Sequence, residues 1–393
     1  MRIAFYAPLK SPTHGTPSGD RRVAGLLMQA LGHAGHEVRL VSEFRAYDGN
    51  GDAQRQVLLR GQGTATGREL AAQWHAGPPS ARPDLWFTYH VYYKAPDWLG
   101  PAASAALGIP YVIAEASYAP KRAGGPWAIG HEAVRDAISR ADLVLCPTHD
   151  DIACLAPLVA ARERIVMLPP FLDALPFRAA RDARNVHRAR LAAEHGLDAS
   201  VPWIVVAAMM RPGDKLASYR SLAAVLGCLQ DLPWRLIVAG DGPARAEVEA
   251  ALHRVVAGRT HFLGELSPGE LAAVQAAGDL CLWPAVNEAY GMAMLEAQAA
   301  GIPVVSCALR GVPDIVEHGR TGLLAPPGDE AALARLARQL LCDAPQREAM
   351  GRRAAAFAGI ERSIEAAGRR LGAALARVHT GRDARAAAGT TAQ

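Results

Sequence analysis

Two glutamates that lie eight residues apart, Glu288 and Glu296, flank the stretch of this sequence best suited to bind a ligand. An apolar run at 280–284 comes before Glu288 and predicts a buried strand, while an alanine-rich run at 293–300 predicts a helix. Gly291 lies between the two runs, and its lack of a Cβ lets the backbone approach a ligand closely. The pattern therefore predicts a strand, a turn that carries one carboxylate, and a helix that begins at the ligand.

The first turn of this predicted helix is expected to bind an anion. Its N–H groups have no partners within the helix, and the helix dipole adds a partial positive charge at this end. These N–H groups belong to Tyr290, Gly291, Met292 and Ala293. Glu296 would lie about 12 Å beyond Glu288 if the intervening residues were all helical. Two carboxylates on either side of a phosphate-binding helix end suit a ligand with hydroxyls on both sides of a diphosphate, as in a nucleotide-sugar.

The order of motifs from Glu288 onward resembles the family-4 retaining glycosyltransferases, which have the GT-B fold. The resemblance starts with the Glu-x7-Glu spacing of Glu288 and Glu296 and continues through further motifs. These lie at 299–305, 311–316, 319–324 and 327–329. The similarity is dense over 204–341 and thinner over 1–168. Because pairs of glutamates eight residues apart are common in helices, the ordered series of motifs carries the resemblance.

The resemblance implies an α/β chain of two Rossmann-like domains, each built on a parallel sheet, that face each other across a cleft. A length of 393 residues suits two domains of ordinary size. The C-terminal helix is expected to cross back to the first domain. We assign an N-terminal acceptor-binding domain, a linker region, a C-terminal nucleotide-sugar-binding domain, a crossover helix and a disordered tail. The acceptor-binding domain spans 1–172 and the linker region spans 173–200. The nucleotide-sugar-binding domain spans 201–358, the crossover helix spans 359–379 and the tail spans 380–393.

The family places an arginine and a lysine just after the first strand of its second domain, and Arg211 and Lys215 match that spacing. The resemblance implies that the two cations neutralise the donor diphosphate. Fixed cations stabilise most strongly the charge that develops on the diphosphate as the sugar departs. The alternative is a pair of surface cations at the start of a helix, which contributes little to stability.

Two further positions in the second half are expected near the nucleotide. Gly240 follows a predicted strand, and either packs close to the nucleotide or only makes the turn. The motif that starts at Gly240 resembles half of a dinucleotide fingerprint, but Arg245 stands at the third glycine position, which argues against NAD binding. Leu263 belongs to a strand and loop against which, in the family, the base packs.

In the first half, the loop at 11–20 takes the place of the glycine-rich loop that the family uses over the donor diphosphate and the acceptor. The usual pair of glycines is Ser18-Gly19 in this chain, and we predict that Gly19 binds substrate. An ordinary connection between a strand and a helix is the alternative. The segment 46–83 is poorly patterned and glycine-rich, so we predict mobile loop there, with one helix near 69–74.

Many family members carry a sugar-facing histidine where this chain has Glu115-Ala116. His90 ends the neighbouring predicted strand, and we expect it to reach the same cleft, with Glu115 in contact with the substrate. The alternative is a strand-end histidine that bonds only to the backbone. Lys121, in a glycine-rich loop, is expected to hold an anionic acceptor or a phosphate, and a solvated loop is the alternative.

The composition narrows the remaining function classes. Lys and Arg number 42 while Asp and Glu number 38, a near balance that argues against a nucleic-acid binder. The six cysteines form no Cys-x-x-Cys pair, which favours reduced thiols in a reducing compartment. The sequence starts without a signal-peptide pattern, and no apolar run reaches the roughly 20 residues that span a bilayer. We therefore predict a cytoplasmic protein, with peripheral contact at the inner membrane, through a basic C-terminal stretch, as the alternative.

Together these assignments predict a retaining glycosyltransferase that moves a sugar from a nucleotide-diphosphate-sugar to an acceptor hydroxyl of a glycan, lipid or small molecule. Glu288 is expected to bind the sugar hydroxyls and to act with Arg211, Lys215 and His90 in catalysis. Glu296 is expected to bind the nucleotide ribose. Because no Asp-x-Asp pair occurs, we expect no metal and no resident cofactor, only a co-substrate linked to UDP or GDP.

Two other functions compete with this prediction. Nucleotide-sugar 2-epimerases share the fold and the donor pocket, but they need additional acid–base carboxylates and histidines. A catalytically weakened sugar-nucleotide-binding protein would explain Ala116 in place of the family histidine. An epimerised donor in the absence of an acceptor would favour the first function, and donor binding without turnover would favour the second. The sequence leaves the sugar, the base, the acceptor and the oligomeric state open.

Overall fold

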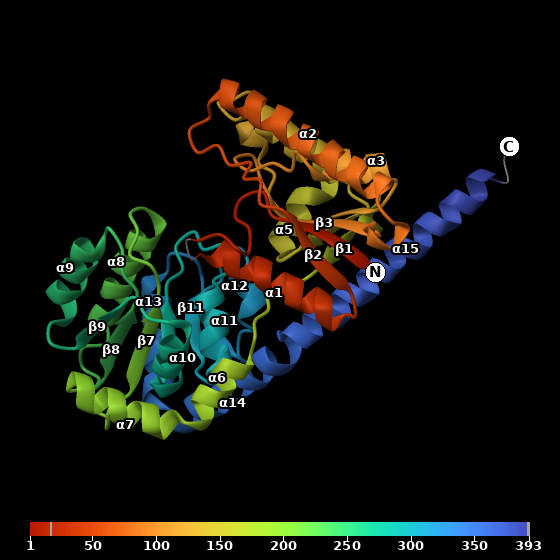
Figure 1. Ribbon diagram of the computed structural model, residues 1–393. Coiled ribbons are helices and arrows are strands. Elements are labelled where there is room, and N and C mark those ends of the chain that lie inside the picture. Colours follow the sequence, from red (N-terminus) through yellow and green to blue (C-terminus); the bar gives the residue numbers. More distant parts are fainter. Residues whose placement is uncertain (16–17, 391–393) are drawn as a thin grey trace. The chain divides into compact units, whose positions relative to one another are not determined.

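The computed structural model describes residues 1–15 and 18–390 of the chain, and side chains up to Val378. The chain divides into two compact units (Figure 1). Unit 1 comprises Met1–Pro169 together with the C-terminal segment that begins at Ile364, and unit 2 comprises Pro170–Ser363. Each unit contains a six-stranded sheet in which neighbouring strands pair in parallel. The predicted α/β class is therefore confirmed.

The sheet of unit 1 has the strand order β2-β1-β3-β4-β5-β6. Its strands are β1 (Arg2–Tyr6), β2 (Glu37–Ser42), β3 (Leu85–Val91), β4 (Tyr111–Ala116), β5 (Leu143–Cys146) and β6 (Ile165–Met167). Its inner strands are almost wholly apolar, as expected for a parallel sheet with helices on both faces. Phe5 of β1 and Phe87 of β3 are fully buried and stack with their ring centroids 5.6 Å apart. The strand order reverses between β1 and β3, and sheets of this type bind ligands at the carboxyl ends of such strands.

The helices of unit 1 are α1 (Gly19–His33), α2 (Ala53–Ala76), α3 (Gly100–Leu107), α4 (Ala128–Arg140), α5 (His149–Leu155) and α15 (Ile364–Thr390). The C-terminal helix α15 packs so closely on α1 that a Cβ on Gly368 would lie 2.8 Å from the carbonyl oxygen of Ala30. The C-terminal helix therefore returns to the first domain, as predicted. It is described as far as Thr390, within the predicted tail at 380–393; the side chains from 379 and the backbone from 391 lie outside the described residues.

The helix predicted near 69–74 is present, but the prediction of mobile loop over the rest of 46–83 was wrong for most of the segment, because that helix is the end of the 24-residue helix α2. The glycines that suggested a loop instead allow close packing against the segment that leads into α3. A Cβ on Gly63 would lie 2.5 Å from the Cβ of Trp98, and a Cβ on Gly67 would lie 2.6 Å from the carbonyl oxygen of Leu99. Small residues thus form part of the buried face of α2, so the helix lacks the apolar stripe by which helices are usually predicted.

Unit 2 repeats the architecture with the strand order β12-β11-β10-β7-β8-β9. Its strands are β7 (Trp203–Ala207), β8 (Arg235–Ala239), β9 (Thr260–Gly264), β10 (Leu280–Trp283), β11 (Val304–Cys307) and β12 (Gly322–Ala325). Its helices are α6 (Leu175–Asp182), α7 (Arg184–His195), α8 (Asp214–Gly227), α9 (Arg245–Val256), α10 (Pro268–Ala277), α11 (Met292–Ala299), α12 (Val312–Ile315), α13 (Glu330–Cys342) and α14 (Ala344–Glu361). The strand order reverses between β7 and β10, so a second ligand site is expected where these strands end.

Residues 173–200, assigned from the sequence to a linker region, form α6 and α7 and belong to unit 2. Both helices pack against α10. The predicted linker is therefore part of unit 2, because its two helices pack on α10.

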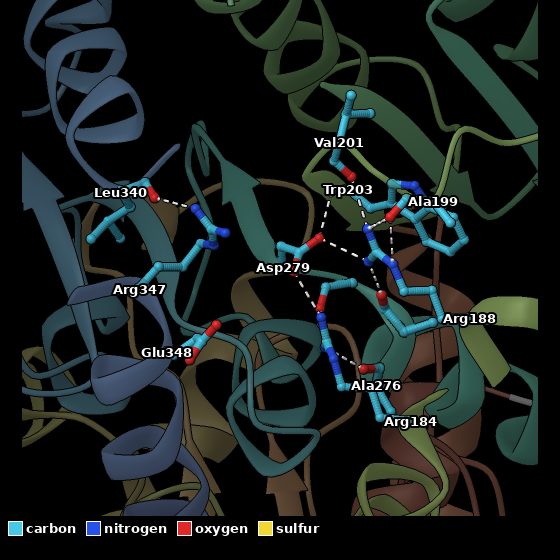
Figure 2. A network of polar contacts seen from close by, with 12 residues as sticks. Arg184, Arg188, Ala199, Val201, Trp203, Ala276, Asp279, Leu340, Arg347 and Glu348 are labelled. Carbon is cyan, nitrogen blue, oxygen red and sulfur yellow. Dashed lines mark hydrogen bonds and ion pairs between the residues drawn. The ribbon is translucent and has the colours of Figure 1, made fainter. Parts of the chain in front are cut away.

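A largely buried carboxylate joins α7 to the sheet of unit 2 (Figure 2). Asp279, just before β10, accepts hydrogen bonds from Nη2 of Arg184 at 2.7 Å, from Nη1 of Arg188 at 2.8 Å and from the backbone N–H of Trp203 at 2.8 Å. The Arg188 guanidinium also lies 4.2 Å from the centre of the Trp203 ring. The network therefore holds together the amino ends of β7 and β10, the two strands between which the strand order reverses.

Candidate functional site

A pocket of about 80 Å³ lies at the carboxyl ends of β7 and β10 in unit 2. Its walls come from these two strands, from the loop after β10, and from the first turns of α8 and α11. The lining residues are Val206, Ala207, Lys215, Cys281, Trp283, Glu288, Gly291, Met292, Ala293 and Met294. The fold thus brings together Lys215 and Glu288 with Gly291, Met292 and Ala293, which the sequence had singled out for one site.

The loop between β10 and α11 has a strained backbone. Ala285 and Asn287 have positive φ angles of 59° and 51°, in the left-handed region that residues with a Cβ rarely adopt. Two bonds tie this loop to α8: the N–H of Val286 donates to Oγ of Ser218 at 3.0 Å, and Nδ2 of Asn287 donates to Oδ2 of Asp214 at 2.8 Å. Strain that the surroundings maintain in this way is typical of functional sites.

Gly291 is required by the geometry of this loop. Its φ is 78°, and a Cβ would lie 2.3 Å from Cε of Met294 and 3.3 Å from Cγ of Glu288. A glycine therefore lets the Glu288 side chain lie directly against the start of α11.

Lys215 and Glu288 form an ion pair at the pocket, through Nζ and Oε2. The same oxygen of Glu288 is 3.4 Å from Nε1 of Trp283, and the Lys215 ammonium lies 5.5 Å from the centre of the Trp283 ring. Trp283 is held in turn by an edge contact with Tyr219 of α8 at 5.1 Å between ring centroids. The predicted diphosphate cation and the predicted sugar-binding carboxylate are thus positioned by one indole ring.

Helix α11 begins at the pocket. Gly291 is its N-cap residue, and within the described part of the chain no side chain makes a capping hydrogen bond there. The amide groups of Met292 and Ala293 therefore bring the partial positive charge of the helix end to the same pocket as the Glu288 carboxylate.

Three other predicted residues of this half lie outside the pocket lining. Arg211 is exposed in the loop between β7 and α8, and Tyr290 is half-buried against the core of unit 2. Glu296 lies one turn further along α11 than the lining residues and is 4% exposed.

Gly240 serves close backbone packing. Its φ is 138°, and a Cβ would lie 2.1 Å from the carbonyl oxygen of Ala208, at the end of β7. Its N–H donates to the carbonyl of Gly264 at 2.7 Å. Leu263 lies next to this contact on β9, half-buried against the core. These contacts require a glycine in the turn after β8.

In unit 1, His90 and Glu115 lie opposite each other on β3 and β4, since Tyr89 pairs with Ala114 and Val91 pairs with Ala116. Both have positive φ angles, of 60° and 61°. Two left-handed residues at one level of a parallel sheet interrupt both strands next to the point where the strand order reverses. This strain marks a second candidate site.

The His90 ring bonds to a carboxylate that the sequence analysis had left unassigned. Nδ1 of His90 lies 2.9 Å from Oδ1 of Asp20, in the first turn of α1, and Nε2 lies 4.0 Å from Oε1 of Glu115. Burial lowers the pKa of His90, but the charges of Glu115 and Asp20 outweigh burial and raise the pKa above its ordinary value. The cluster of Asp20, His90 and Glu115 therefore favours a protonated imidazole between two carboxylates.

The other two predicted residues of unit 1 lie at the start of a helix and in a short turn. Gly19 is the first residue of α1 and has open space where a Cβ would lie, so packing does not require a glycine there. Lys121 is exposed in the short 3-10 turn Pro120–Arg122. Thr16 and Pro17, in the predicted substrate loop before Gly19, lie outside the described residues.

Over the described ranges, no three His, Cys, Asp or Glu side chains gather as metal ligands would. A search of the same ranges finds no helix with the length and apolar character of a membrane span.

Comparison with known proteins gives a family match within unit 2. Residues 203–343 match the family described as "Glycosyl transferases group 1". The chain is 30% identical over 257 residues to the 2-deoxystreptamine glucosyltransferase of Streptomyces kanamyceticus, which covers 62% of this chain and 64% of that protein. It is 27% identical over 222 residues to the N-acetyl-alpha-D-glucosaminyl L-malate synthase of Bacillus anthracis, which covers 56% of each chain.

Among solved structures, HepE from Anabaena in complex with UDP matches with a TM-score of 0.71 at 17% identity, over 96% of this chain and 100% of HepE. At this identity the likeness shows the fold, and the predicted GT-B class of two Rossmann-like parallel-sheet units is confirmed. The chain spans 27% to 64% of the length of four curated relatives that it matches. The family match includes the pocket of unit 2 and all of its lining residues.

Proposed function

Because residues 203–343 carry a glycosyl transferases group 1 domain, we propose that this chain is a retaining glycosyltransferase, which moves a sugar from a nucleotide-diphosphate-sugar to an acceptor hydroxyl. The observation that carries the proposal is the pocket at which the Lys215 cation, the Glu288 carboxylate and the start of α11 meet. A diphosphate binds cations and N–H donors, and sugar hydroxyls bind carboxylates. This pocket offers both kinds of partner.

In this proposal, Lys215 and the amide groups of Met292 and Ala293 bind the diphosphate, with Arg211 as a second cation. Negative charge builds on the diphosphate as the sugar departs, so these groups stabilise the transition state more than the ground state. Glu288 binds the hydroxyls of the departing sugar once its ion pair with Lys215 opens. The leaving phosphate takes the proton of the acceptor hydroxyl, so no protein base is required beside Glu288.

The remaining predicted residues have supporting roles. Glu296 binds the nucleotide ribose, while Leu263 and Tyr290 lie near the base, and Gly240 shapes the turn beneath it. In unit 1, His90 and Glu115 act on the transferred sugar, and Gly19 and Lys121 contact the acceptor.

The proposed donor carries UDP, with GDP as the second choice. HepE, which shares the fold, was solved with UDP and with UDP-glucose, and this supports a uridine donor. The reaction as proposed uses no metal and no resident cofactor, because the cations and helix amides of the pocket neutralise the diphosphate. The protein is proposed to act in the cytoplasm on a glycan, lipid or small molecule, with peripheral contact at the inner membrane when the acceptor is a lipid, and without a nucleic-acid partner.

The relatives do not indicate which acceptor this chain uses. One relative is named for 2-deoxystreptamine, an aminocyclitol, and another for L-malate, a dicarboxylate. Acceptors of opposite charge thus occur among proteins of similar identity to this chain, so the acceptor must be argued from unit 1 itself.

The test is a donor screen followed by product analysis. UDP-sugars and GDP-sugars are titrated against the full chain, and the bound donor is incubated with a panel of acceptors in excess chelator. Retained anomeric configuration in the product, measured by NMR, supports the proposal. Binding of no nucleotide-sugar, or transfer with inversion, overturns it, and dependence of turnover on a divalent ion overturns the metal-free mechanism.

A second candidate, a nucleotide-sugar 2-epimerase, is favoured by the cluster of Asp20, His90 and Glu115. Such an isomerase needs acid–base carboxylates and a histidine, and unit 1 places these three side chains together. Incubation of a nucleotide-sugar without an acceptor separates the two functions, because only the isomerase returns an epimerised donor.

A further inference from the structure

A row of aromatic rings leads away from His90 in unit 1. The His90 ring lies 5.2 Å from that of Tyr92, Tyr92 lies 5.6 Å from Tyr93, and Tyr93 lies 5.5 Å from Trp127, measured between ring centroids. The rings of Tyr92, Tyr93 and Trp127 are half-buried, so each keeps an exposed portion. We call these four side chains the aromatic row.

Two cations, Lys94 and Arg122, share the far end of the aromatic row. Here the cluster means these two cations with the rings of Tyr93 and Trp127. Nζ of Lys94 lies 4.7 Å from the centre of the Trp127 ring and 6.0 Å from that of Tyr93. Cζ of Arg122 lies 5.3 Å from the centre of the Tyr93 ring and 6.0 Å from that of Trp127. In the part of the chain that is described, neither cation is within ion-pair distance of a carboxylate. Two positive charges over one pair of rings repel each other, and an anion bound to both relieves this repulsion.

The nearby carboxylate of Asp48 is engaged elsewhere. Asp48 is buried, and its two carboxylate oxygens accept hydrogen bonds from the backbone N–H of Asn50 at 3.0 Å and from Nε2 of Gln56 at 3.0 Å. Its backbone contacts the side chain of Trp127 and the backbone of Lys94: the carbonyl accepts from Nε1 of Trp127 at 2.9 Å, and the N–H donates to the carbonyl of Lys94 at 2.8 Å. The Asp48 side chain therefore serves to hold the loop and leaves the charge of Lys94 unmatched.

The loops that carry the cluster are fixed to one another. Gln56, buried at the start of α2, also donates to the carbonyl of Pro126 at 2.9 Å and accepts from the N–H of Gly130 at 3.1 Å. Gly130 packs so closely on the turn at Tyr93 that a Cβ would lie 2.2 Å from the Tyr93 carbonyl oxygen. A surface held in this way loses little freedom when a ligand binds. The loops follow β2, β3 and β4, so the cluster lies at the same edge of the sheet as His90.

We propose that this cluster binds an acceptor saccharide that carries an oxyanion, with its sugar ring on the aromatic row and its anionic group at Lys94 and Arg122. The inference rests on the proposed glycosyl transfer and names its acceptor class. Aromatic faces pack against the C–H groups of a sugar ring, and a pair of cations recognises phosphate or carboxylate through charge-assisted hydrogen bonds. Along the aromatic row, Tyr92 lies between His90 and the rings that carry the two cations. The anionic group of the acceptor would therefore bind away from His90, where the sugar is proposed to react.

The test measures binding rather than turnover. D-glucose, D-glucose 6-phosphate, D-glucuronate and inorganic phosphate are titrated against the full chain by ligand-observed NMR at low salt, and UDP is titrated separately by calorimetry. The variant Lys94→Met/Arg122→Met removes both charges and keeps much of the side-chain volume. Arg140→Met, at the exposed end of α4, is the matched control.

We expect the two anionic sugars to bind at least about tenfold more tightly than glucose, and the double variant to lose that advantage while the control keeps it. Comparison of glucose 6-phosphate with glucuronate then identifies the preferred oxyanion. Equal affinity for glucose and its phosphate, unchanged affinity in the double variant, or equal affinity for inorganic phosphate and glucose 6-phosphate would each overturn the inference. The UDP titration keeps the two proposals apart, because absence of UDP binding to the wild type counts against the glycosyltransferase. Since the UDP pocket belongs to unit 2 and both substitutions lie in unit 1, a urea denaturation curve that matches the wild type shows that the double variant is folded.

Discussion

Lys215 and Glu288 are ion-pair partners across the pocket of unit 2, and Trp283 contacts both. The cation expected to bind a diphosphate and the carboxylate expected to bind a sugar thus neutralise each other. A donor that engages both must open this pair, and the cost of opening it offsets part of the binding free energy. The side chains are 33% and 17% exposed, so water screens their attraction only in part.

The first prediction concerns the release of this pair. Glu288→Gln should strengthen binding of UDP, which has a diphosphate but no sugar, by about three- to tenfold, because Lys215 is no longer neutralised. Turnover should fall at least about 100-fold, because the sugar loses its carboxylate. Lys215→Met should weaken UDP binding by about ten- to 100-fold. Calorimetry and a transfer assay measure these effects, with Glu247→Gln on the exposed face of α9 as the control.

An increase in the dissociation constant of UDP for Glu288→Gln would show that the pair does not compete with the diphosphate. Equal losses of turnover and UDP affinity in the two variants would contradict the division of roles proposed for Lys215 and Glu288.

Gly240→Ala should destabilise unit 2 by at least about 2 kcal/mol, because its Cβ would meet a backbone oxygen that cannot move away and its φ is strained for any other residue. Gly269→Ala, in the first turn of α10 with open space at the Cβ position, should cause no loss. Denaturation by urea, followed by circular dichroism, compares the two variants. Equal urea midpoints for the two variants would contradict this prediction and would mean that the turn between β8 and α9 can shift to accommodate a Cβ.

Much of the pocket of unit 2 could be predicted because its signals are local. Glu288, Gly291, Met292 and Ala293 lie in one short stretch, and the change from strand to helix within it indicates both the turn and the helix end. Lys215 could be placed because the family resemblance puts a lysine at this spacing after the first strand of the second domain. Its partner could not be predicted, since 73 residues separate it from Glu288 and nothing in either stretch indicates the other.

The parts that were missed depend on contacts between distant segments. Asp20 lies 70 residues from His90 and has the appearance of an ordinary first-turn acid of a helix. The cluster of Lys94 and Arg122 forms only when three loops meet. Only the last part of helix α2 was predicted, near 69–74, because the buried glycines before it lack the apolar period on which such predictions depend. A signal for Asp20 did exist, since it follows a helix-capping serine at the end of the predicted substrate loop.

A third prediction concerns the protonation of His90. Since Glu115 and Asp20 raise its pKa in spite of burial, NMR titration should place the pKa of His90 above the ordinary value of about 6.5. The resulting stabilisation is fully present below the unfolded value of about 6.5 and is lost as the pH rises through the folded value. Asp20→Asn should lower the pKa of His90 and flatten the pH dependence of the unfolding free energy over that range. The His90 signal is identified by its loss in His90→Gln.

A measured pKa of His90 at or below 6.5 would contradict this description of the cluster. An unchanged pKa of His90 in Asp20→Asn would mean that Glu115 and the more weakly acting Asp151 account for the shift.

The last prediction concerns the network around Asp279, at the opposite ends of β7 and β10 from the pocket. Asp279→Ala leaves the guanidinium groups of Arg184 and Arg188 without a counter-ion in a largely buried site, so it should destabilise unit 2 by about 3 kcal/mol. Arg188→Lys keeps the charge but cannot reproduce a planar group that donates to several carbonyls, and should cost about 1–2 kcal/mol.

Arg190→Lys is the matched control, because Arg190 forms an exposed pair with Glu194 within the same helix and should change stability by less than about 0.5 kcal/mol. Urea denaturation gives these values, and a UDP titration of the folded variants gives a second measurement. The affinity for UDP should be unchanged in Arg188→Lys, because the pocket is held by its own bonds between α8 and the loop after β10. A loss of UDP affinity in Arg188→Lys without a loss of stability would contradict this. It would mean that the contacts at the amino end of β10 determine the position of Glu288 beyond its carboxyl end.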